Sequence, residues 1–128
     1  MTTVEELLAA AREEIWRVAP AEAVEAVERG ALLIDIRQAH QRERDGLIPG
    51  AYVVERNVLE WRLDPRGDHR DPRLARADVP VILICDEGYQ SSLAAALLRS
   101  FGLDSGDVIG GVQGWMQDGL PLDGREAP

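Results

Sequence analysis

Apolar and polar positions along the chain form blocks that predict helices alternating with short strands. Near the N-terminus, Thr3 and Glu6 have the spacing of a capping box. The apolar positions that follow recur at helical intervals: Val4, Leu7, Leu8, Ala11 and Ile15. We therefore expect a helix over about residues 3–16. Pro20 suits the first turn of a second helix over residues 21–29, and Gly30 is a helix stop signal.

Short apolar runs after the second helix predict buried strands. The strongest run directly precedes Cys85, and the predicted strands are residues 31–36, 51–54, 79–84 and 107–109. Further helices are predicted at 57–61, where Asn57 is a candidate cap, and at 91–101 and 112–118. Residues 37–50 are predicted as a loop, and residues 63–78 as the longest and most mobile loop. Strands that alternate with helices favour parallel pairing in a three-layer α/β sheet.

The length of 128 residues, with 45% apolar and 29% charged residues, suits one globular domain with a buried core. The N-terminus lacks the basic and apolar segments of a secretory signal, and no apolar run is long enough to span a membrane. The single cysteine, Cys85, excludes an internal disulfide and fits a reducing compartment. We therefore expect a cytoplasmic protein.

The charged residues exclude several classes of function. All 14 basic residues are arginines, so mechanisms that need a lysine amine, such as a Schiff base or a Walker-type phosphate site, are excluded. The net charge is −9, and acids outnumber arginines in residues 1–36 and 77–128. Because such a surface repels nucleic acid and anionic membranes, we expect neither as a partner.

Candidate chemistry lies where the strongest strand ends. Cys85 follows the buried strand and is followed by a tight loop and a helix, and Gly88 supplies the freedom for a positive φ. Loops at the carboxyl ends of strands bind ligands, and their N–H groups form anion-binding nests. We expect the thiol there to be partly ionised. The candidate binding loop is Asp86, Glu87, Gly88, Tyr89, Gln90 and Ser91. The position alone leaves open whether Cys85 is instead an inert core residue.

Four segments, taken in order, resemble the rhodanese-like domain family. Residues 33–37 are similar to its Asp-x-Arg signature, and residues 46–51 to its Gly-His-Ile-Pro-Gly-Ala segment. Residues 81–91 match its active-site strand and loop, and residues 110–121 its closing segment. The resemblance covers about residues 17–121, which leaves an extra N-terminal helix at about 3–16 and a tail at 122–128. It implies one domain over residues 1–128, with a central parallel five-stranded sheet flanked by helices.

The resemblance also implies sulfur transfer. Cys85 is then the nucleophile that takes the outer sulfur of a small donor or a protein persulfide, holds it as a persulfide and passes it to a thiol acceptor. The loop N–H groups stabilise the anionic sulfur, as an oxyanion hole stabilises oxygen. Ser91 is expected to hydrogen-bond the cysteine sulfur. No metal or organic cofactor is implied.

Departures from the family pattern bear on the sulfur donor. The loop has Gln90 where the family often has Arg or Lys, and Leu47 stands where the family has His. Asp86 and Glu87 place negative charge beside the thiol, which opposes dianionic donors such as thiosulfate. We therefore expect thiosulfate to be a poor donor and a neutral or protein-bound persulfide to be a better one.

Several residues outside the loop are candidates for supporting roles. Asp35 and Arg37 are expected to tie the end of one strand to its neighbour, or to orient the loop. Arg56 is a candidate to replace the missing cation at Gln90. Ser92 starts the following helix with Ser91, and Trp115 is expected in the core, with lining of the pocket as an alternative.

Other functions remain as alternatives. A cysteine-based phosphatase needs an arginine six positions after the cysteine, where this chain has Ser91. His40 and His69 have no other ligand at metal-binding spacing, which argues against zinc. A regulatory module with little turnover and a thiol redox sensor both stay open. The apolar stripe of the N-terminal helix is expected to pack on the domain or on a partner, either a second copy or a partner enzyme.

Overall fold

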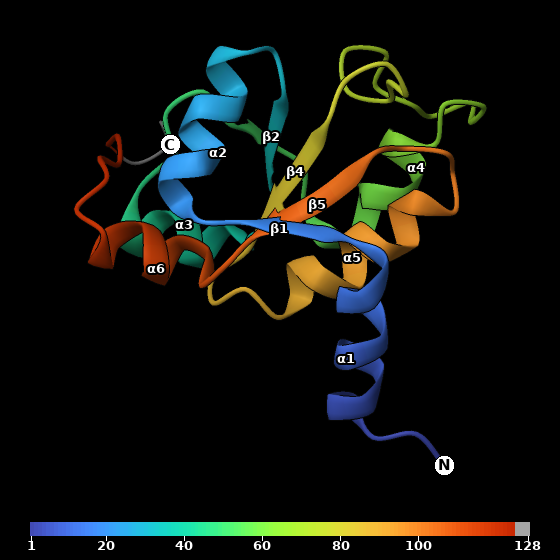
Figure 1. Cartoon of the computed structure of the whole chain (residues 1–128). Helices are drawn as coiled ribbons and strands as arrows, with labels where there is room; N and C mark the ends of the chain where they lie inside the picture. Colours follow the sequence, from blue (N-terminus) through green and yellow to red (C-terminus); the bar gives the residue numbers. More distant parts are fainter. Residues whose placement is uncertain (125–128) are drawn as a thin grey trace.

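The computed structural model describes residues 1–124 and consists of a five-stranded, all-parallel sheet with six α-helices packed on it (Figure 1). The strand order is β1-β5-β4-β2-β3. The strands are β1 (Trp16–Val18), β2 (Leu32–Asp35), β3 (Tyr52–Val53), β4 (Val81–Ile84) and β5 (Ser105–Val108). The predicted three-layer, five-stranded parallel fold is therefore confirmed. β4 is the middle strand, so the residue that follows it lies at the centre of the sheet's carboxyl edge.

The helices cover both faces of the sheet. They are α1 (Val4–Glu14), α2 (Pro20–Glu28), α3 (Ala39–Asp45), α4 (Leu59–Leu63), α5 (Gln90–Arg99) and α6 (Gly111–Gln117), with a 3₁₀ turn η1 (Arg56–Val58) before α4. Among the residues described, none of these helices has the length and apolar character needed to cross a membrane.

Alternating strand residues form two separate cores. Leu32, Ile34 and Leu83 pack with residues of α4 and α5, and Cys85 belongs to this same cluster. Leu33 and Ile82, on the opposite face, pack with residues of α2 and α6. β2 and β4 are buried on both faces of the sheet. This explains why their sequences are largely continuous apolar runs rather than alternating apolar and polar residues. Because of this alternation, the Cys85 side chain points toward α5.

Most predicted elements are confirmed within two or three residues of their ends. The capping box at Thr3 and Glu6 starts α1, and Pro20 occupies the first turn of α2. Two elements were not predicted: residues 37–50, expected as a loop, contain α3, and the three-residue β1 follows α1 directly. α3 is almost entirely polar, and β1 is too short to show a period, so neither has a hydrophobic pattern. Asn57 makes no capping hydrogen bond and lies inside η1.

The longest segment without helix or strand is the predicted one, between α4 and β4. It is held to the body by Leu74, which is buried in the α4–α5 core. The predicted tail also contacts the body as far as it is described. Asp123 forms an isolated antiparallel bridge with Leu47, while residues 125–128 lie outside the described part of the chain.

Candidate functional site

Cys85 lies directly after β4, with 6% of its surface exposed. Its Sγ accepts hydrogen bonds from the backbone N–H groups of Gly88 at 3.2 Å and Ser91 at 3.3 Å. In the thiol form, Sγ also donates to Ser91 Oγ at 3.2 Å. The loop therefore curls around the sulfur, and backbone donors surround it as expected for an anion-binding nest.

The start of α6 fixes the outer side of this loop. The N–H groups of Val112 and Gln113 donate to the carbonyl oxygens of Cys85 and Asp86, at 2.9 and 3.0 Å. The approach is so close that a Cβ on Gly111 would lie 2.5 Å from the Cys85 oxygen. Gly111 has a φ of 59°, so glycine is required there both for space and for conformation.

Four loop amides remain without an acceptor within the described part of the chain: the N–H groups of Asp86, Glu87, Tyr89 and Gln90. In a trans peptide the N–H points opposite to the carbonyl of the preceding residue. The anchored carbonyls of Cys85 and Asp86 therefore direct the N–H groups of Asp86 and Glu87 away from α6. Together with the two N–H groups on Sγ, these amides can bind an anionic group attached to the sulfur.

Behind the loop, Ser91 connects the cysteine to a buried carboxylate. Ser91 Oγ donates to Asp107 Oδ2 at 2.7 Å, and Ser92 Oγ donates to the same oxygen at 2.8 Å. Asp107 is fully buried on β5 and forms an ion pair with Arg17, whose Nε lies 2.8 Å from Oδ1. The Ser91 hydroxyl thus has an acceptor on one side and the Cys85 sulfur on the other.

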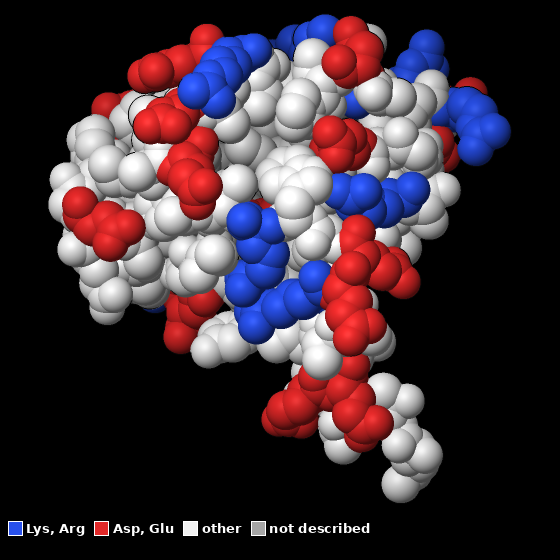
Figure 2. Space-filling model, viewed as in Figure 1, with Lys and Arg blue, Asp and Glu red and all other residues white. Residues whose placement is uncertain are grey.

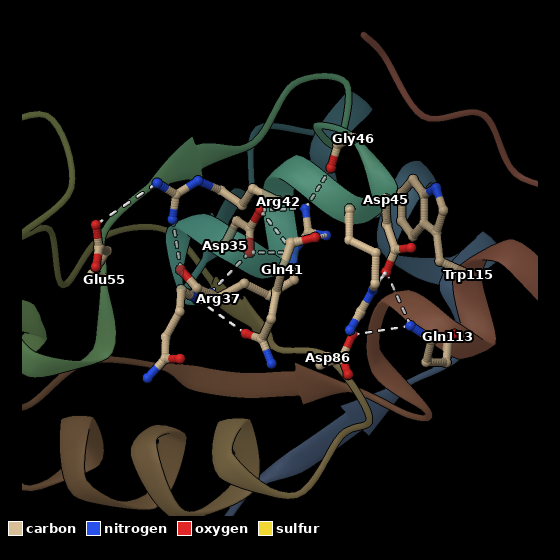
Figure 3. Close-up of polar contacts among 12 residues, drawn as sticks. Asp35, Arg37, Gln41, Arg42, Asp45, Gly46, Glu55, Asp86, Gln113 and Trp115 are labelled. Carbon is tan, nitrogen blue, oxygen red and sulfur yellow. Dashed lines mark hydrogen bonds and ion pairs between the residues drawn. The ribbon is translucent and has the colours of Figure 1, made fainter. Parts of the chain in front are cut away.

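The Asp86 carboxylate lies in a polar cluster with Asp45 and Gln113 (Figure 3). Its carboxylate accepts from Arg44 at 2.7 Å and from the Gln113 amide at 3.0 Å. Arg44 also pairs with Asp45 at 2.7 Å, and this hydrogen bond holds the pKa of Asp45 below its ordinary value, against the opposing effect of its burial. The pKa of Arg44 is raised, chiefly by the same bond. Asp86 is therefore paired within a cluster that joins α3, the loop and α6, in which Asp45 and Asp86 share the single guanidinium of Arg44.

Asp35 and Arg37 form a fully buried ion pair at the end of β2, with Nη2 2.8 Å from Oδ2. Arg37 Nη2 also donates to the Gly46 carbonyl at 2.8 Å, beyond the C-terminus of α3 (Figure 3). Arg42 adds a bond from Nη1 to the Arg37 carbonyl. The pair therefore ties β2 to the middle and the C-terminal end of α3, which forms one wall of the pocket at Cys85.

Cys85 opens onto a pocket of about 300 Å³ between the loop, α3 and η1. Its lining includes three glutamines and two arginines: Gln38, Gln41, Gln90, Arg37 and Arg56. Arg56 pairs with Glu60 at 2.6 Å, so its charge is matched. Glu87 also lines the pocket and makes no hydrogen bond or ion pair with the rest of the described chain.

The predicted site residues therefore fall into three groups. The loop residues 86–91, Ser92 and Arg56 lie around Cys85 or directly behind its loop. Asp35 and Arg37 support the neighbouring wall, and Arg37 also lines the pocket. Trp115 lies elsewhere: it is 2% exposed in the α2–α6 core, where its indole N–H donates to the Pro121 carbonyl at 2.9 Å.

Three residues that contact the loop from behind, Arg12, Arg17 and Asp107, were missed by the sequence analysis. Arg12 and Arg17 each donate to the Gly88 carbonyl, at 2.8 and 3.0 Å. Asp107 carried a weak signal, as an acidic residue at the start of the predicted strand 107–109. The arginines carried none, because they lie at least 71 positions from their loop partner in the sequence.

Comparison with known proteins assigns the chain to a family. The model of the rhodanese-like domain matches residues 19–118, and the chain therefore belongs to the rhodanese-like domain family. It is 30% identical over 108 residues to the thiosulfate sulfurtransferase GlpE of Haemophilus influenzae, which covers 83% of this chain and 92% of that protein. The GlpE protein of Actinobacillus pleuropneumoniae serotype 7 is 30% identical over 113 residues, covering 87% and 95%.

Solved structures share the fold of this chain. A protein of unknown function from Rhodopseudomonas palustris, described as a possible tyrosine phosphatase, superposes with a TM-score of 0.87 and 28% identity over 96% of both chains. The polysulfide-sulfur transferase homodimer of Wolinella succinogenes superposes with a TM-score of 0.70 and 23% identity, covering 93% of this chain and 85% of that one. The second likeness concerns the fold alone.

Proposed function

We propose that the protein is a sulfurtransferase in which Cys85 carries the transferred sulfur. The Cys85 thiolate attacks the outer sulfur of a donor, so that a Cys85–sulfur bond forms and the donor's sulfur–sulfur bond breaks. The donor fragment leaves with that electron pair. An acceptor thiolate then attacks the outer sulfur of the Cys85 persulfide, and the electron pair of the broken bond returns to Cys85. The two half-reactions balance without a cofactor.

The observation that carries this proposal is the set of backbone donors around the sulfur. Two N–H groups bond Sγ, and four more in the same loop have no acceptor within residues 1–124. Donors fixed in this way stabilise a negative sulfur without reorganising during the reaction. The relatives called thiosulfate sulfurtransferases support the same chemistry. Phosphate ester hydrolysis fits less well, because Ser91 replaces the arginine that clamps a phosphate and donates its hydroxyl to Asp107.

Intact-mass measurement tests the proposal. The reduced protein is incubated with a low-molecular-weight persulfide or with thiosulfate, and a gain of one sulfur atom, lost again on adding cyanide or excess thiol, is expected. Cys85→Ser should gain nothing. Mass gain only as oxygen adducts or disulfide-linked dimers would overturn the proposal in favour of a redox sensor. No gain with any donor would favour a binding module without turnover.

We also propose that a thiol persulfide, small or protein-bound, is the preferred donor. The Arg56 charge is matched by Glu60, whereas Glu87 has no partner within residues 1–124, so the described lining of the pocket carries an excess of negative charge. That excess disfavours a dianion such as thiosulfate more than a monoanionic or neutral donor. Asp86 contributes less than its sequence position suggests, because it shares the Arg44 guanidinium with Asp45 and its charge is partly offset.

Charge variants at the pocket test the donor preference. Gln90 and Glu87 are exposed and have no side-chain partner among the described residues, so changing them leaves other contacts intact. Gln90→Arg and Glu87→Gln should each raise kcat/KM for thiosulfate by about 3- to 10-fold and change that for a persulfide by less. Glu25→Gln, on the exposed side of α2, is the matched control. Equal effects on both donors would contradict the charge argument.

Arg56 is proposed to contact the end of the bound donor that lies away from Cys85, because both residues line the same pocket. Arg56→Gln should raise KM for an anionic donor about 3-fold or more, while kcat changes little, because the lost contact is made equally in the ground and transition states. Arg76→Gln, which removes a similarly paired surface arginine, serves as the control. An unchanged KM for Arg56→Gln would remove Arg56 from the site.

A further inference from the structure

Residues 1–18, which precede the range matched by the family model, contact the back of the Cys85 loop. α1 packs against α5 and projects beyond the body (Figure 1). From α1, Arg12 reaches the loop with two donors: Nη2 bonds the Gly88 carbonyl at 2.8 Å, and Nε bonds Ser92 Oγ at 3.1 Å. From β1, Arg17 Nη2 bonds the same carbonyl at 3.0 Å. Residues 1–18 lie outside the matched range, yet they supply these two contacts.

The Gly88 carbonyl controls the direction of one loop amide. It is the third loop carbonyl that is held from outside, after those of Cys85 and Asp86, which α6 holds. Because the peptide between Gly88 and Tyr89 is trans, the Tyr89 N–H points away from the two guanidinium groups. This N–H is one of the four without an acceptor. Arg12 and Arg17 therefore orient the Tyr89 N–H in the second half of the loop, as α6 orients the N–H groups of Asp86 and Glu87 in the first half.

Arg12 also leaves one positive charge behind the loop. Arg17 is matched by Asp107, with Nε 2.8 Å from Oδ1. Arg12 has no carboxylate partner among the described residues; it bonds a carbonyl and a hydroxyl, and its guanidinium lies 5.7 Å from the centre of the Tyr89 ring. In Figure 2, arginine side chains lie where α1 joins the body, next to the acidic residues along α1. This part-buried charge is screened less than an exposed one.

We infer that Arg12, with Arg17, is a positioning residue of the Cys85 loop, and that its charge takes the place of the cation that Gln90 does not supply. The inference rests on the proposed function for its purpose, but not for its geometry. One positive charge behind the loop suits a single negative charge on the sulfur, as in a thiolate or a persulfide anion. It acts through the Gly88 peptide and does not touch the substrate.

Alkylation of Cys85 tests the inference without any sulfur donor. The rates with anionic iodoacetate and neutral iodoacetamide are measured at one pH, and their ratio is compared between variants. The thiolate fraction and the accessibility of the loop affect both reagents and largely cancel in the ratio. Loss of the charge behind the loop lowers the rate with the anion selectively. A purely structural role of Arg12 would leave the ratio unchanged.

Arg12→Gln should lower the iodoacetate-to-iodoacetamide ratio about 3-fold at low ionic strength, and added salt should shrink the difference. Arg12→Lys, which keeps the charge and loses the two-donor geometry, should retain the ratio. Arg29→Gln, which removes an exposed arginine at the end of α2, is the matched control. A ratio for Arg12→Gln that equals the wild-type ratio, or one that the Arg29 control reproduces, would overturn the inference. Absence of sulfur gain in the mass experiment would instead overturn the proposed function and leave this result standing.

Discussion

Two aspartate–arginine pairs with buried carboxylates flank the middle strand, and they are built differently. Asp35 and Arg37 are two residues apart, fully buried, and bond each other through two nitrogens of the guanidinium. Asp107 and Arg17 are 90 residues apart; Asp107 is fully buried, while the Arg17 side chain is 19% exposed. The first pair holds α3 against the end of β2, and the second holds the N-terminal segment against the Cys85 loop.

The two pairs differ in whether they contact the Cys85 loop, so we expect one to affect the stability of the fold and the other to affect also the chemistry of Cys85. The other Arg37 hydrogen bonds go to the carbonyls of Gln41, inside α3, and of Gly46, directly after α3, and not to the Cys85 loop. Asp107 also accepts from Ser91, which contacts the Cys85 sulfur, and Arg17 bonds Gly88. We therefore expect changes in the first pair to act mainly on unfolding, and changes in the second to act also on the reactivity of Cys85.

Arg37→Gln should give the largest loss of stability. It leaves the Asp35 carboxylate buried without its cation, which costs about 3–5 kcal/mol when one partner of a buried pair is removed. Urea unfolding measures this loss. The double variant Asp35→Asn/Arg37→Gln should recover part of it, because no uncompensated charge remains buried. A double variant no more stable than Arg37→Gln alone would show that the carbonyl bonds, and not the ion pair, carry the effect.

Arg17→Gln should cost less stability but change the chemistry. Asp107 keeps two hydroxyl donors when Arg17 is lost, so we expect about 2 kcal/mol, as for a hydrogen bond to a charged group. The alkylation rate of Cys85, measured in the folded range, should also fall, because the Gly88 carbonyl loses one of its donors. In Arg37→Gln that rate should stay near the wild-type value. A larger change in the alkylation rate for Arg37→Gln than for Arg17→Gln would contradict the assignment of the effect on Cys85 to the Asp107–Arg17 pair.

Ser91→Ala and Ser92→Ala separate the structural role of the Asp107–Arg17 pair from its effect on Cys85. Both hydroxyls donate to Asp107 Oδ2, so each loss should destabilise by about 1 kcal/mol. Only Ser91 contacts the Cys85 sulfur, where its hydroxyl can accept from the thiol or turn to donate to the thiolate. Sulfur transfer should therefore fall about 10-fold in Ser91→Ala and about 2-fold in Ser92→Ala. Matching losses of activity would remove Ser91 as a special contact.

The same comparison shows why part of the fold and site could be predicted. Asp35 and Arg37 form a local pair that is visible as two charges at the end of an apolar strand. Cys85 was likewise visible, because it ends the strongest apolar run before a glycine-containing loop. In such cases the sequence neighbours are also the spatial neighbours, so patterning and turn chemistry suffice.

The rest depends on contacts that the local sequence does not encode. Arg12 and Arg17 carry no signal in the local sequence. The packing of α1 on α5 brings Arg12 to Gly88, and the pairing of β1 with β5 brings Arg17 there. Asp86 read as a charge beside the thiol, and α3, which the sequence analysis did not predict, carries the Asp45 carboxylate that helps to turn Arg44 toward it. Long-range ion pairs have no periodicity, so a single sequence cannot reveal them.

The smallest expected effect concerns the partly exposed cluster of Arg44, Asp45 and Asp86, in contrast to the two pairs with buried carboxylates. The pKa of Asp45 is lowered by its hydrogen bond from Arg44, so its charged form stabilises the folded state. This contribution is fully present above the ordinary aspartate value of 3.8 and is lost as the pH falls through the lower folded value. The free energy of unfolding of Asp45→Asn, measured in urea, should therefore lie slightly below wild type near pH 6 and converge with it in acid.

High salt should shrink the difference between Asp45→Asn and wild type at pH 6, because Arg44 is half exposed. A gap that persists unchanged into acid would mean that Asp45 acts through packing or through its bond to Gln113 rather than through charge.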